Sequence, residues 1–416
     1  MQKCRISNKP LIELFTLGSL YVSDFIKDGE NPRGDKHELK MMFNEESGLL
    51  QLEKTTPLDI MYGKYWYRSG INNTMRNELK DIVNSCLESI EFNDGDLFLD
   101  IACNDGTLLS YVPNNLRRIG VDPADDSYKR ESMKHADEII QDYFTIENYR
   151  KCKFADKKAK IITTIAMFYD LDDPSSFLDD VIEVLDDEGL FVMQLSYTPL
   201  MIVQLAFDNI CHEHVCYYSL SSLKYILDKK GLDIVDVQLN DINGGSFRVY
   251  IRKNNADKTK FKTSPYRDVA NYRINSILEY EKKMNFDKAD VYKEFYKKIC
   301  ELREQTVSFI KKEKSRGKVI WGYGASTKGN TLLQWYGLDN TLIDAIAERS
   351  PYKYGLKTVG THIPIYSEEI MREKQPDYLI VLPWHYISEF KKREIEYLRR
   401  GGKFIMPSPK FEIISI

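Results

Sequence analysis

The spacing of apolar and polar residues divides the chain into an irregular start and a regular remainder. Residues 1–70 hold short apolar runs that are interrupted by a charged stretch with Gly and Pro, DGENPRGDKHELK, and this predicts a small lobe built around a loop. Over residues 71–255, short apolar runs alternate with helical stretches: DLFLDIA, RRIGVDP, KIITTIAMF and GLFVMQL. Strands that alternate with helices predict parallel βαβ units, so this part is expected to form a doubly wound, Rossmann-like domain.

Residues 256–315 carry a different pattern, which is strongly charged and helical. Apolar residues recur there at three-to-four-residue spacing, as one stripe on a charged helix: Tyr292, Phe295, Ile299, Leu302 and Phe309. This pattern predicts a helical connector. Over residues 316–416, strand-like runs such as KVIWGYGAS and PDYLIVLPW alternate with helices again. The predicted fold class is therefore α/β, with a small N-terminal lobe and two Rossmann-like doubly wound domains joined by a helical connector.

Charge and composition exclude several classes of protein. The 416-residue chain has 59 Lys and Arg against 63 Asp and Glu, a net charge of -4, which lacks the footprint of a dedicated nucleic-acid binder. The longest apolar runs are too short to cross a bilayer, and the stretch MQKCRISNKPLIELF lacks the features of a signal peptide. A cytoplasmic protein without a membrane partner is expected. The seven cysteines are scattered and never spaced CxxC, which offers neither a disulfide framework nor an evident zinc site.

The turn after the first strand of the first Rossmann-like domain is the first candidate binding site. Its sequence, DIACNDGT over residues 100–107, is not GxGxxG, so it offers little to a dinucleotide pyrophosphate. Asp100 suits an ammonium group, Gly106 allows close backbone approach, and Asp122 after the next strand suits ribose hydroxyls. Asp142 follows the third strand, where it could meet an adenine amino group. Each carboxylate alone could be a helix cap, but their order favours S-adenosylmethionine (SAM) over a generic nucleotide site.

Two of only six histidines lie together in CHEHVCYY, residues 211–218. One interpretation is a metal site, in which His212 and His214 act with Glu213, Cys211 or Cys216, although the spacing HExxH is absent. Another is general acid/base chemistry, for which the pKa of histidine is suited. A third is a hydrogen-bonded polar turn. We place acid/base chemistry ahead of metal binding, because a proton-abstracting site needs one base and polarising donors.

Three further segments carry candidate binding residues. YGKYWYRSG, residues 62–70, has an aromatic density that fits core packing, a nucleic-acid stacking surface or a lid that excludes water. Its place next to the predicted cofactor site favours the lid. NDINGGSFR, residues 240–248, is either a hairpin turn or a sugar or phosphate contact through Asn243, Ser246 and Arg248. The glycine loop WGYGASTKGNT, residues 321–331, reads G-x-G-x-x-T and adds a lysine, which suits the diphosphate of a nucleotide-sugar or of NAD.

Several motifs together resemble the three-domain nucleotide-sugar C-methyltransferases, the family of the NDP-hexose 3-C-methyltransferases. They are YGKYWYRSGINNTMR, DIACNDGTLL, AMFYDLDDP, CHEHVCYYSL, NDINGGSFRVY, GYGASTKGNTLL and VGTHIPI with VLPW, and they run along nearly the full length. The resemblance implies an enzyme with a small lobe, a SAM-binding domain and a C-terminal domain that helps to hold a nucleotide-sugar substrate.

The resemblance also implies roles for individual residues. His214 would be the base, with Glu213 and His212 orienting or polarising the sugar and Tyr67 nearby. The cofactor would be bound by the lid, the first loop and the later strand ends: Tyr65, Ser69, Asp100, Cys103, Asn104, Gly106, Asp122 and Asp142. The substrate would be bound by the hairpin and the second loop with its following strand: Asn243, Ser246, Arg248, Gly324, Ser326, Lys328, Gly329 and Glu348.

The chain departs from the family pattern at two places. The family's lobe usually carries four zinc cysteines, whereas the matching positions here are Cys4, Ser7, Asn44 and Ser47. We therefore predict no structural zinc and no other bound metal, with the lobe held by packing alone. The family also has a tyrosine before HEH, where Cys211 stands here.

The reaction expected from the resemblance is methylation of a 4-keto nucleotide-linked deoxysugar, at C3. His214 would remove the C3 proton, and the enolate carbon would take the methyl group of SAM. Three alternatives remain at this point: methyl transfer to oxygen or nitrogen of a sugar or other small molecule, a nicotinamide-dependent oxidoreductase, and a non-catalytic nucleotide-sugar-binding protein. The nucleotide, the sugar stereochemistry, the pathway and the oligomeric state are not indicated.

Overall fold

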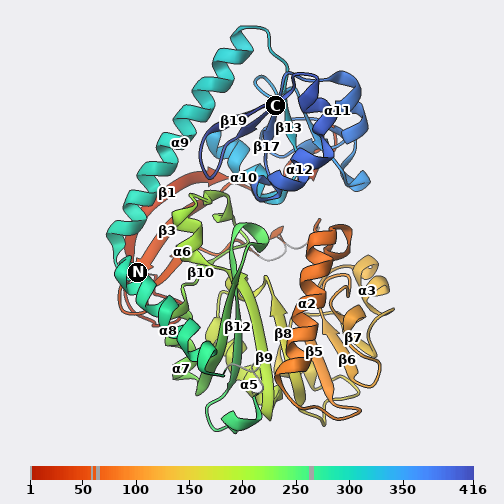
Figure 1. The fold of residues 1–416 in the computed structure, drawn as a ribbon, viewed down its shortest axis with the longest axis vertical. Coiled ribbons are helices and arrows are strands. Elements are labelled where there is room, and N and C mark those ends of the chain that lie inside the picture. Colours follow the sequence, from red (N-terminus) through yellow and green to blue (C-terminus); the bar gives the residue numbers. More distant parts are fainter. Residues whose placement is uncertain (1, 58–59, 62–65, 262–266) are drawn as a thin grey trace.

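The computed structural model describes residues 2–57, 60–61, 66–261 and 267–416, and it confirms the predicted α/β fold class. Figure 1 shows two sheet-containing domains one above the other, with a long helix and the N-terminal strands along one side of both. The N-terminal lobe therefore lies alongside both domains.

The N-terminal lobe is a four-stranded sheet with the order β1-β3-β4-β10. Three of its strands come from the lobe itself, β1 (Ile12–Leu20), β3 (His37–Asn44) and β4 (Leu49–Leu52). The fourth, β10 (Cys216–Tyr217), comes from the middle domain and pairs with β4 directly after the HEH motif. A two-residue strand, β2 (Phe25–Ile26), pairs with β15 (Lys357–Thr358) of the C-terminal domain. The lobe therefore joins both domains and holds the HEH segment through a strand.

The middle domain has a seven-stranded sheet with the order β11-β12-β9-β8-β5-β6-β7. β12 runs antiparallel to both neighbours, and the pairs from β9 to β7 are parallel. Because parallel strands end on the same edge, the turns after β5, β6 and β8 meet there. The strands are β5 (Leu97–Ile101), β6 (Arg117–Val121), β7 (Glu138–Ile140), β8 (Ala159–Ile165), β9 (Leu185–Ser196), β11 (Leu232–Asn240) and β12 (Ser246–Lys253). The helices are α2 (Asn73–Ser89), α3 (Asp126–Ser132), α4 (Ile146–Tyr149), α5 (Pro174–Val184), α6 (Thr198–Val203) and α7 (Leu220–Lys229).

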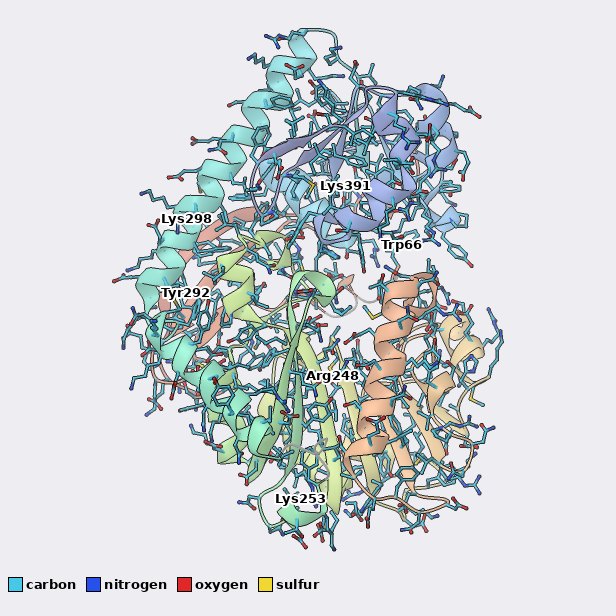
Figure 2. The ribbon with its side chains drawn as sticks, in the orientation of Figure 1. Trp66, Arg248, Lys253, Tyr292, Lys298 and Lys391 are labelled. Atoms are coloured by element: carbon cyan, nitrogen blue, oxygen red, sulfur yellow. The ribbon has the colours of Figure 1, made fainter. Side chains whose placement is uncertain are left out.

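Two helices, α8 (Arg267–Lys283) and α9 (Ala289–Ser315), connect the domains. The predicted stripe on α9 faces inward, with Tyr292, Phe295, Ile299 and Leu302 buried, whereas the neighbouring lysines, such as Lys298, are exposed (Figure 2). Near its start, the ring of Tyr292 lies 4.9 Å from that of Phe43 in the lobe. The apolar stripe therefore gives α9 one buried face along its length, which packs first against the lobe and then against the domains.

The C-terminal domain is a six-stranded sheet with the order β16-β14-β13-β17-β18-β19, parallel except for β19. Its central strand β13 leads through the second glycine loop into α10, whose first turn reaches the middle domain through the hydrogen bond from Lys328 to Asn209. The strands are β13 (Ile320–Tyr323), β14 (Ala345–Glu348), β16 (Ile365–Ser367), β17 (Tyr378–Val381), β18 (Lys403–Met406) and β19 (Glu412–Ile414). The helices are α10 (Thr327–Tyr336), α11 (Glu368–Lys374), α12 (Ile387–Arg393) and α13 (Ile395–Arg399). Among the residues described, no helix has the length and apolar character needed to cross a membrane.

The four positions where the resembled family carries zinc cysteines lie together in the lobe and form a hydrogen-bonded cluster. Asn44 Oδ1 accepts hydrogen bonds from Ser7 Oγ at 3.0 Å and from Ser47 Oγ at 2.8 Å. Cys4 Sγ lies 3.3 Å from Ser47 Oγ, and all four residues are buried. The expectation that packing alone holds the lobe was therefore incomplete, because buried hydrogen bonds occupy this position. Over the described residues, no group of three or more His, Cys, Asp or Glu side chains is placed to hold a metal.

We predict that Asn44→Ala lowers the free energy of unfolding by about 2 kcal/mol, because two buried hydroxyl donors lose their acceptor. Urea unfolding measures this, with the exposed neighbour Glu45→Ala as a control that should change stability little. Adding a chelator should leave the unfolding midpoint of the wild-type protein unchanged. Stoichiometric zinc in the purified protein would contradict the predicted absence of a metal.

Candidate active site

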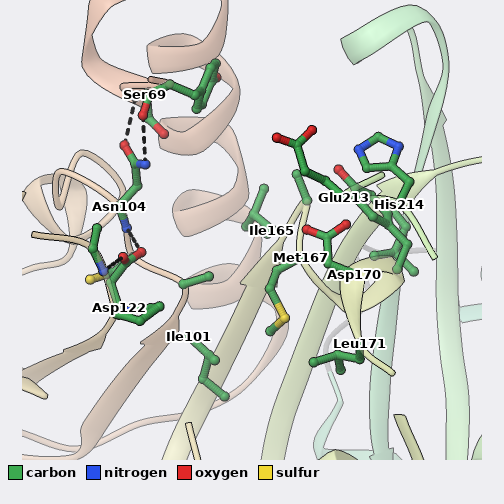
Figure 3. A pocket seen from close by; sticks show the side chains of 18 of the residues that line it. Ser69, Ile101, Asn104, Asp122, Ile165, Met167, Asp170, Leu171, Glu213 and His214 are labelled. Carbon is green, nitrogen blue, oxygen red and sulfur yellow. Dashed lines mark hydrogen bonds between the residues drawn. The ribbon is translucent and has the colours of Figure 1, made fainter. Parts of the chain in front are cut away.

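A cavity of about 600 Å³ opens at the carboxyl edge of the middle sheet. Its walls come from the lobe, the middle domain and the C-terminal domain, for example Trp66, Asp122 and Lys328. Figure 3 shows Ser69, Asn104 and Asp122 on one side and Asp170, Glu213 and His214 on the other. The apolar side chains of Ile165 and Met167 lie between the two groups. The predicted cofactor site and the predicted catalytic site around the HEH motif are therefore the two ends of one cavity.

The cofactor end is organised by Asn104. Its backbone N–H donates to Asp122 Oδ2 at 2.8 Å, which ties the loop after β5 to the end of β6. Its side-chain amide accepts from the Ser69 N–H at 3.1 Å and donates to the Tyr67 carbonyl at 3.0 Å. Asn104 itself has a φ of 53°, and Ala102 has a φ of 63°. Left-handed backbone at non-glycine residues is uncommon and gathers at functional sites.

Asp100 lies at the bottom of this end and is 3% exposed. Burial raises the pKa of Asp100 to about 7, although the Thr163 hydroxyl donates to its Oδ1 at 2.7 Å. Burial also raises the pKa of Asp122, whose Oδ1 accepts from the Ala124 N–H at 2.9 Å. A cation that binds beside a buried carboxylate stabilises its charged form, so these two aspartates favour a positively charged ligand. Asp142 lines the cavity at the exposed rim. This row of acidic groups along an apolar wall fits the ammonium, sulfonium and hydroxyl groups of SAM.

The opposite end contains His214, which is buried. Its Nδ1 lies 2.9 Å from the carbonyl oxygen of Asn209. A carbonyl can only accept, so Nδ1 carries the proton and Nε2 is left as the basic nitrogen. Burial, assisted by the charge of Lys328, lowers the pKa of His214 to about 3, which keeps the imidazole neutral. The ring centroid of Tyr169 lies 4.3 Å from that of the His214 imidazole, so the tyrosine packs against the histidine ring.

Glu213 lines the cavity beside His214. Burial raises the pKa of the Glu213 carboxyl. The thiol of Cys211 donates to Glu213 Oε2 over 3.7 Å, and burial raises the pKa of this thiol well above its ordinary value. Cys211 is therefore a neutral thiol that supports Glu213.

The C-terminal domain contributes Lys328 to the same end of the cavity. Lys328 follows the N-cap residue Ser326 in the first turn of α10, and its Nζ donates to Asn209 Oδ1 at 2.6 Å. The cavity therefore holds an acidic row at one end and a neutral base, a carboxyl and a lysine at the other.

Two family models match consecutive parts of the chain after the N-terminal lobe. A methyltransferase domain matches residues 71–237, and a C-methyltransferase C-terminal domain matches residues 241–409. The chain belongs to the SAM-dependent C-methyltransferases. A full-length relative, the C-methyltransferase NovU of Streptomyces niveus, is 28% identical over 419 residues, which cover 100% of this chain and 97% of NovU. These matches confirm the predicted enzyme class and SAM as cofactor, and they set aside the oxidoreductase alternative.

Two solved methyltransferase structures that are similar to this C-methyltransferase each cover less than half of it. The N-methyltransferase NodS of Bradyrhizobium japonicum is 12% identical and covers 44% of this chain and 98% of its own, with a TM-score of 0.34. A SAM-dependent methyltransferase of Clostridium acetobutylicum is 16% identical and covers 42% of this chain and 91% of its own, with a TM-score of 0.33.

His212 does not point into the cavity of this C-methyltransferase. Its Nε2 lies 3.0 Å from the carbonyl oxygen of His37, and the two imidazole rings meet edge to face. Burial lowers the pKa of His212 to about 4. The expectation that His212 orients or polarises the sugar is corrected: it fixes the HEH segment to the lobe.

Two residues of the first loop serve packing. A Cβ on Gly106 would lie 2.6 Å from the Cα of Ser132, so this glycine lets the loop approach the end of α3, and its approach to the cofactor stays a prediction. The Cys103 thiol packs where Gly120 has no side chain, and burial raises the pKa of this thiol. Cys103 is a cavity wall residue with a neutral, inward-packed thiol. Tyr65 lies outside the described residues, and the Tyr67 side chain lines the cavity mouth, 42% exposed.

The second glycine loop is likewise shaped by packing. A Cβ on Gly324 would lie 2.7 Å from Pro383, and one on Gly329 would lie 3.0 Å from Leu382. The Ser326 hydroxyl accepts from the Gly329 N–H at 3.0 Å as the cap of α10. The carboxylate of Glu348 is engaged by three backbone N–H groups, those of Ala325, Arg349 and Ser350. Gly324, Ser326, Gly329 and Glu348 therefore build the loop that carries Lys328, and their contact with the substrate stays a prediction.

Of the three hairpin residues, Asn243 and Ser246 line the cavity and Arg248 does not. Arg248 is 3% exposed on β12, where its guanidinium donates to Glu78 Oε1 at 2.8 Å and to Gln194 Oε1 at 3.1 Å. The expected substrate contact of Arg248 is corrected, because this side chain fixes α2 and Gln194 against the sheet.

Arg248→Met is expected to destabilise the protein by about 3 kcal/mol, because it leaves the Glu78 carboxylate without its buried cation. Lys253→Met, on the same strand, is the matched control (Figure 2), since Lys253 pairs with the exposed Asp187 and should change stability by less than about 1 kcal/mol. Urea unfolding compares the two. Equal effects would show that the Arg248 pair is no stronger than a surface pair.

Sequence reasoning missed three cavity or support residues. Asp170, at the end of η3 (Phe168–Asp170), lies beside Glu213 and His214 in Figure 3. Gln194 lies in the cavity wall at the end of β9, and Asn209 holds both His214 and Lys328. The available signal was position: Gln194 is a polar residue near the carboxyl end of β9, and Asp170 lies in the segment that follows β8.

Proposed function

We propose that the enzyme methylates the carbon next to the ketone of a 4-keto nucleotide-linked deoxysugar, at C3. The observation that carries this proposal is the neutral His214, held as the Nδ1–H tautomer with Nε2 as the basic nitrogen, in the same cavity as the acidic cofactor end. A carbon nucleophile must first lose a proton. The Nδ1–H tautomer of His214 leaves the lone pair of Nε2 to accept that proton.

His214 Nε2 takes the C3 proton, and the electron pair of the broken C–H bond moves into the enolate. Hydrogen-bond donors around the sugar stabilise the negative charge on the enolate oxygen. SAM, when bound, supplies an electrophilic methyl group on a sulfonium, whose C–S bond electrons remain on sulfur as the new C–C bond forms. The chain then has to hold the enolate carbon in line with that methyl group.

The cofactor contacts follow from the acidic end of the cavity. Asp100 and the loop around Asn104 would hold the amino-acid end of SAM, Asp122 its ribose hydroxyls, and Asp142 at the rim its adenine. Ser69, tied to Asn104, would close over the amino-acid end. The wall made by Ile165, Met167 and Leu171 keeps water from the reacting carbon.

The nucleotide-sugar assignment rests on the family resemblance and on the C-terminal domain. That domain brings the N-terminus of α10 to the cavity and closes the site with Thr327 and Lys328. Asn243 and Ser246 offer an amide and a hydroxyl to the sugar from the middle domain. The reaction is expected in the cytoplasm.

The substrate class is tested with methyl-labelled SAM and a panel of acceptors. The panel contains 4-keto nucleotide-sugars, the same 4-keto sugars without the nucleotide, and the 4-hydroxy nucleotide-sugars. We expect label transfer only to the 4-keto nucleotide-sugars, because the ketone acidifies the C–H bond and the nucleotide supplies binding energy. Equal transfer to the 4-hydroxy compounds would contradict an enolate mechanism, and equal transfer to free sugars would contradict the nucleotide requirement.

A further inference from the structure

Lys328 belongs to the C-terminal domain but ends inside the catalytic end of the cavity. The docking of η4 (Phe207–Asn209) against α10 puts it there. The ring of Phe207 lies 4.8 Å from that of Trp335 and 5.3 Å from that of Tyr336. The neighbouring Asp208 carboxylate accepts from Trp384 Nε1 at 3.2 Å. Aromatic packing therefore fixes α10 against the segment that leads into the HEH motif, and the buried hydrogen bond fixes η8 (Trp384–Tyr386) against the same segment.

Asn209, 4% exposed, binds the base and the lysine at once. Its backbone carbonyl accepts from His214 Nδ1 at 2.9 Å, and its side-chain oxygen accepts from Lys328 Nζ at 2.6 Å. Its Nδ2 donates to the carbonyl of Ala206 at 3.1 Å, which sets the side-chain oxygen toward the lysine. One rigid residue thus holds the base and the ammonium group next to each other.

We propose that Lys328 is a catalytic residue whose ammonium group stabilises the enolate oxygen as His214 takes the proton, and that Asn209 is the positioning residue that fixes the two. The inference rests on the proposed function. It differs from a role of Lys328 in binding the diphosphate, which the glycine loop suggested.

The chemistry of the substrate separates these two roles. In a hexose the diphosphate is attached at C1, whereas the ketone at C4 is bonded directly to C3 and lies across the ring from C1. Asn209 holds both the Lys328 ammonium group and His214, the base that removes the C3 proton. The ammonium group is therefore expected next to the oxygen on C4, which is the ring carbon bonded to C3. Negative charge appears on that oxygen only as the C–H bond breaks, so the lysine acts on the transition state more than on substrate binding.

The test compares Lys328→Met and Lys328→Gln with the wild-type enzyme. We expect kcat to fall by about 10²-fold to 10³-fold, as for loss of an oxyanion donor, with KM for the nucleotide-sugar and Kd for SAM changed by less than about threefold. Unchanged Kd for SAM shows that the variants are folded. Lys357→Met, which removes a lysine paired with the exposed Asp28, is the matched control and should leave kcat unchanged.

A rise in KM with kcat retained would overturn the proposal in favour of diphosphate binding. If the wild-type enzyme places the methyl group on oxygen, the proposed function itself fails. If it methylates carbon and Lys328→Met keeps wild-type kcat, only the present inference fails.

Asn209→Leu tests the positioning role. This variant keeps the backbone carbonyl for His214 and removes the oxygen that holds Lys328. We expect kcat to fall by about tenfold, and the double variant with Lys328→Met to be no slower than Lys328→Met alone, since both changes act on one interaction. Independent, multiplying losses would show that Asn209 acts only on the fold and would overturn its assigned role.

Discussion

Replacing His214 by Asn is expected to lower kcat by about 10³-fold, within the range found for loss of a general base. The expected loss is this large because His214 Nε2 is the basic nitrogen at the catalytic end of the cavity and Asn has no comparable basicity. The Kd for SAM should stay near its wild-type value, because the acidic row lies at the other end. Steady-state kinetics and calorimetric titration with SAM measure the two quantities.

His212→Asn is the matched control, two positions away in the same motif. Its imidazole contacts the lobe backbone at His37 rather than the cavity, so we expect a loss of stability and a kcat within about tenfold of wild type once the protein is folded. A His214→Asn enzyme with unchanged turnover would contradict the assignment of the base. The reverse order of effects would make His212 the base instead.

The second large effect is expected at Asp100. Asp100→Asn should weaken SAM binding by about 10-fold to 100-fold at pH 8, because a charge-assisted hydrogen bond to the ammonium group is lost. The wild-type affinity should also depend on pH. Because burial raises the pKa of Asp100 to about 7, the carboxyl is neutral below that pH and ionised above it, so SAM should bind more weakly as pH falls through about 7.

Titration calorimetry between about pH 6 and pH 8.5 measures this dependence, and binding near pH 7 should release protons from Asp100. Asp100→Asn should lose both the pH dependence and the proton release. Asp94→Asn, at an exposed carboxylate, is the control and should retain both. A wild-type affinity that is flat across this range would contradict the role of Asp100 as the ammonium ligand.

The fold could be predicted because its signals are local. Four strands of the middle sheet, β5, β6, β8 and β9, contain the apolar runs that predicted them. In one of these strands, Leu97–Ile101, every residue is buried, and the intervening helices show their own periodicity. The order of Asp100, Asp122 and Asp142 after successive strands was informative for the same reason. Parallel strands end on one edge, so residues that follow them meet there without any knowledge of the loops.

Side-chain direction could not be predicted in the same way. Gly106 and Gly324 have the sequence context of ligand-binding loops, yet the atoms that fill their space belong to Ser132 and Pro383. His212 is separated from His37 by 175 positions, and no local pattern reveals that contact. Lys328 likewise belongs to one domain and acts in another, because the docking of α10 on η4 decides where it ends.

The most direct test of the account follows the hydrogen that must leave. A 4-keto nucleotide-sugar deuterated at C3 is incubated with SAM that carries a ¹³C-methyl group, and the product is examined by NMR and mass spectrometry. We predict that the methyl group is bonded to C3 and that the deuterium has been lost from the product. A product with the methyl group on oxygen and the deuterium retained at C3 would contradict the proposed reaction.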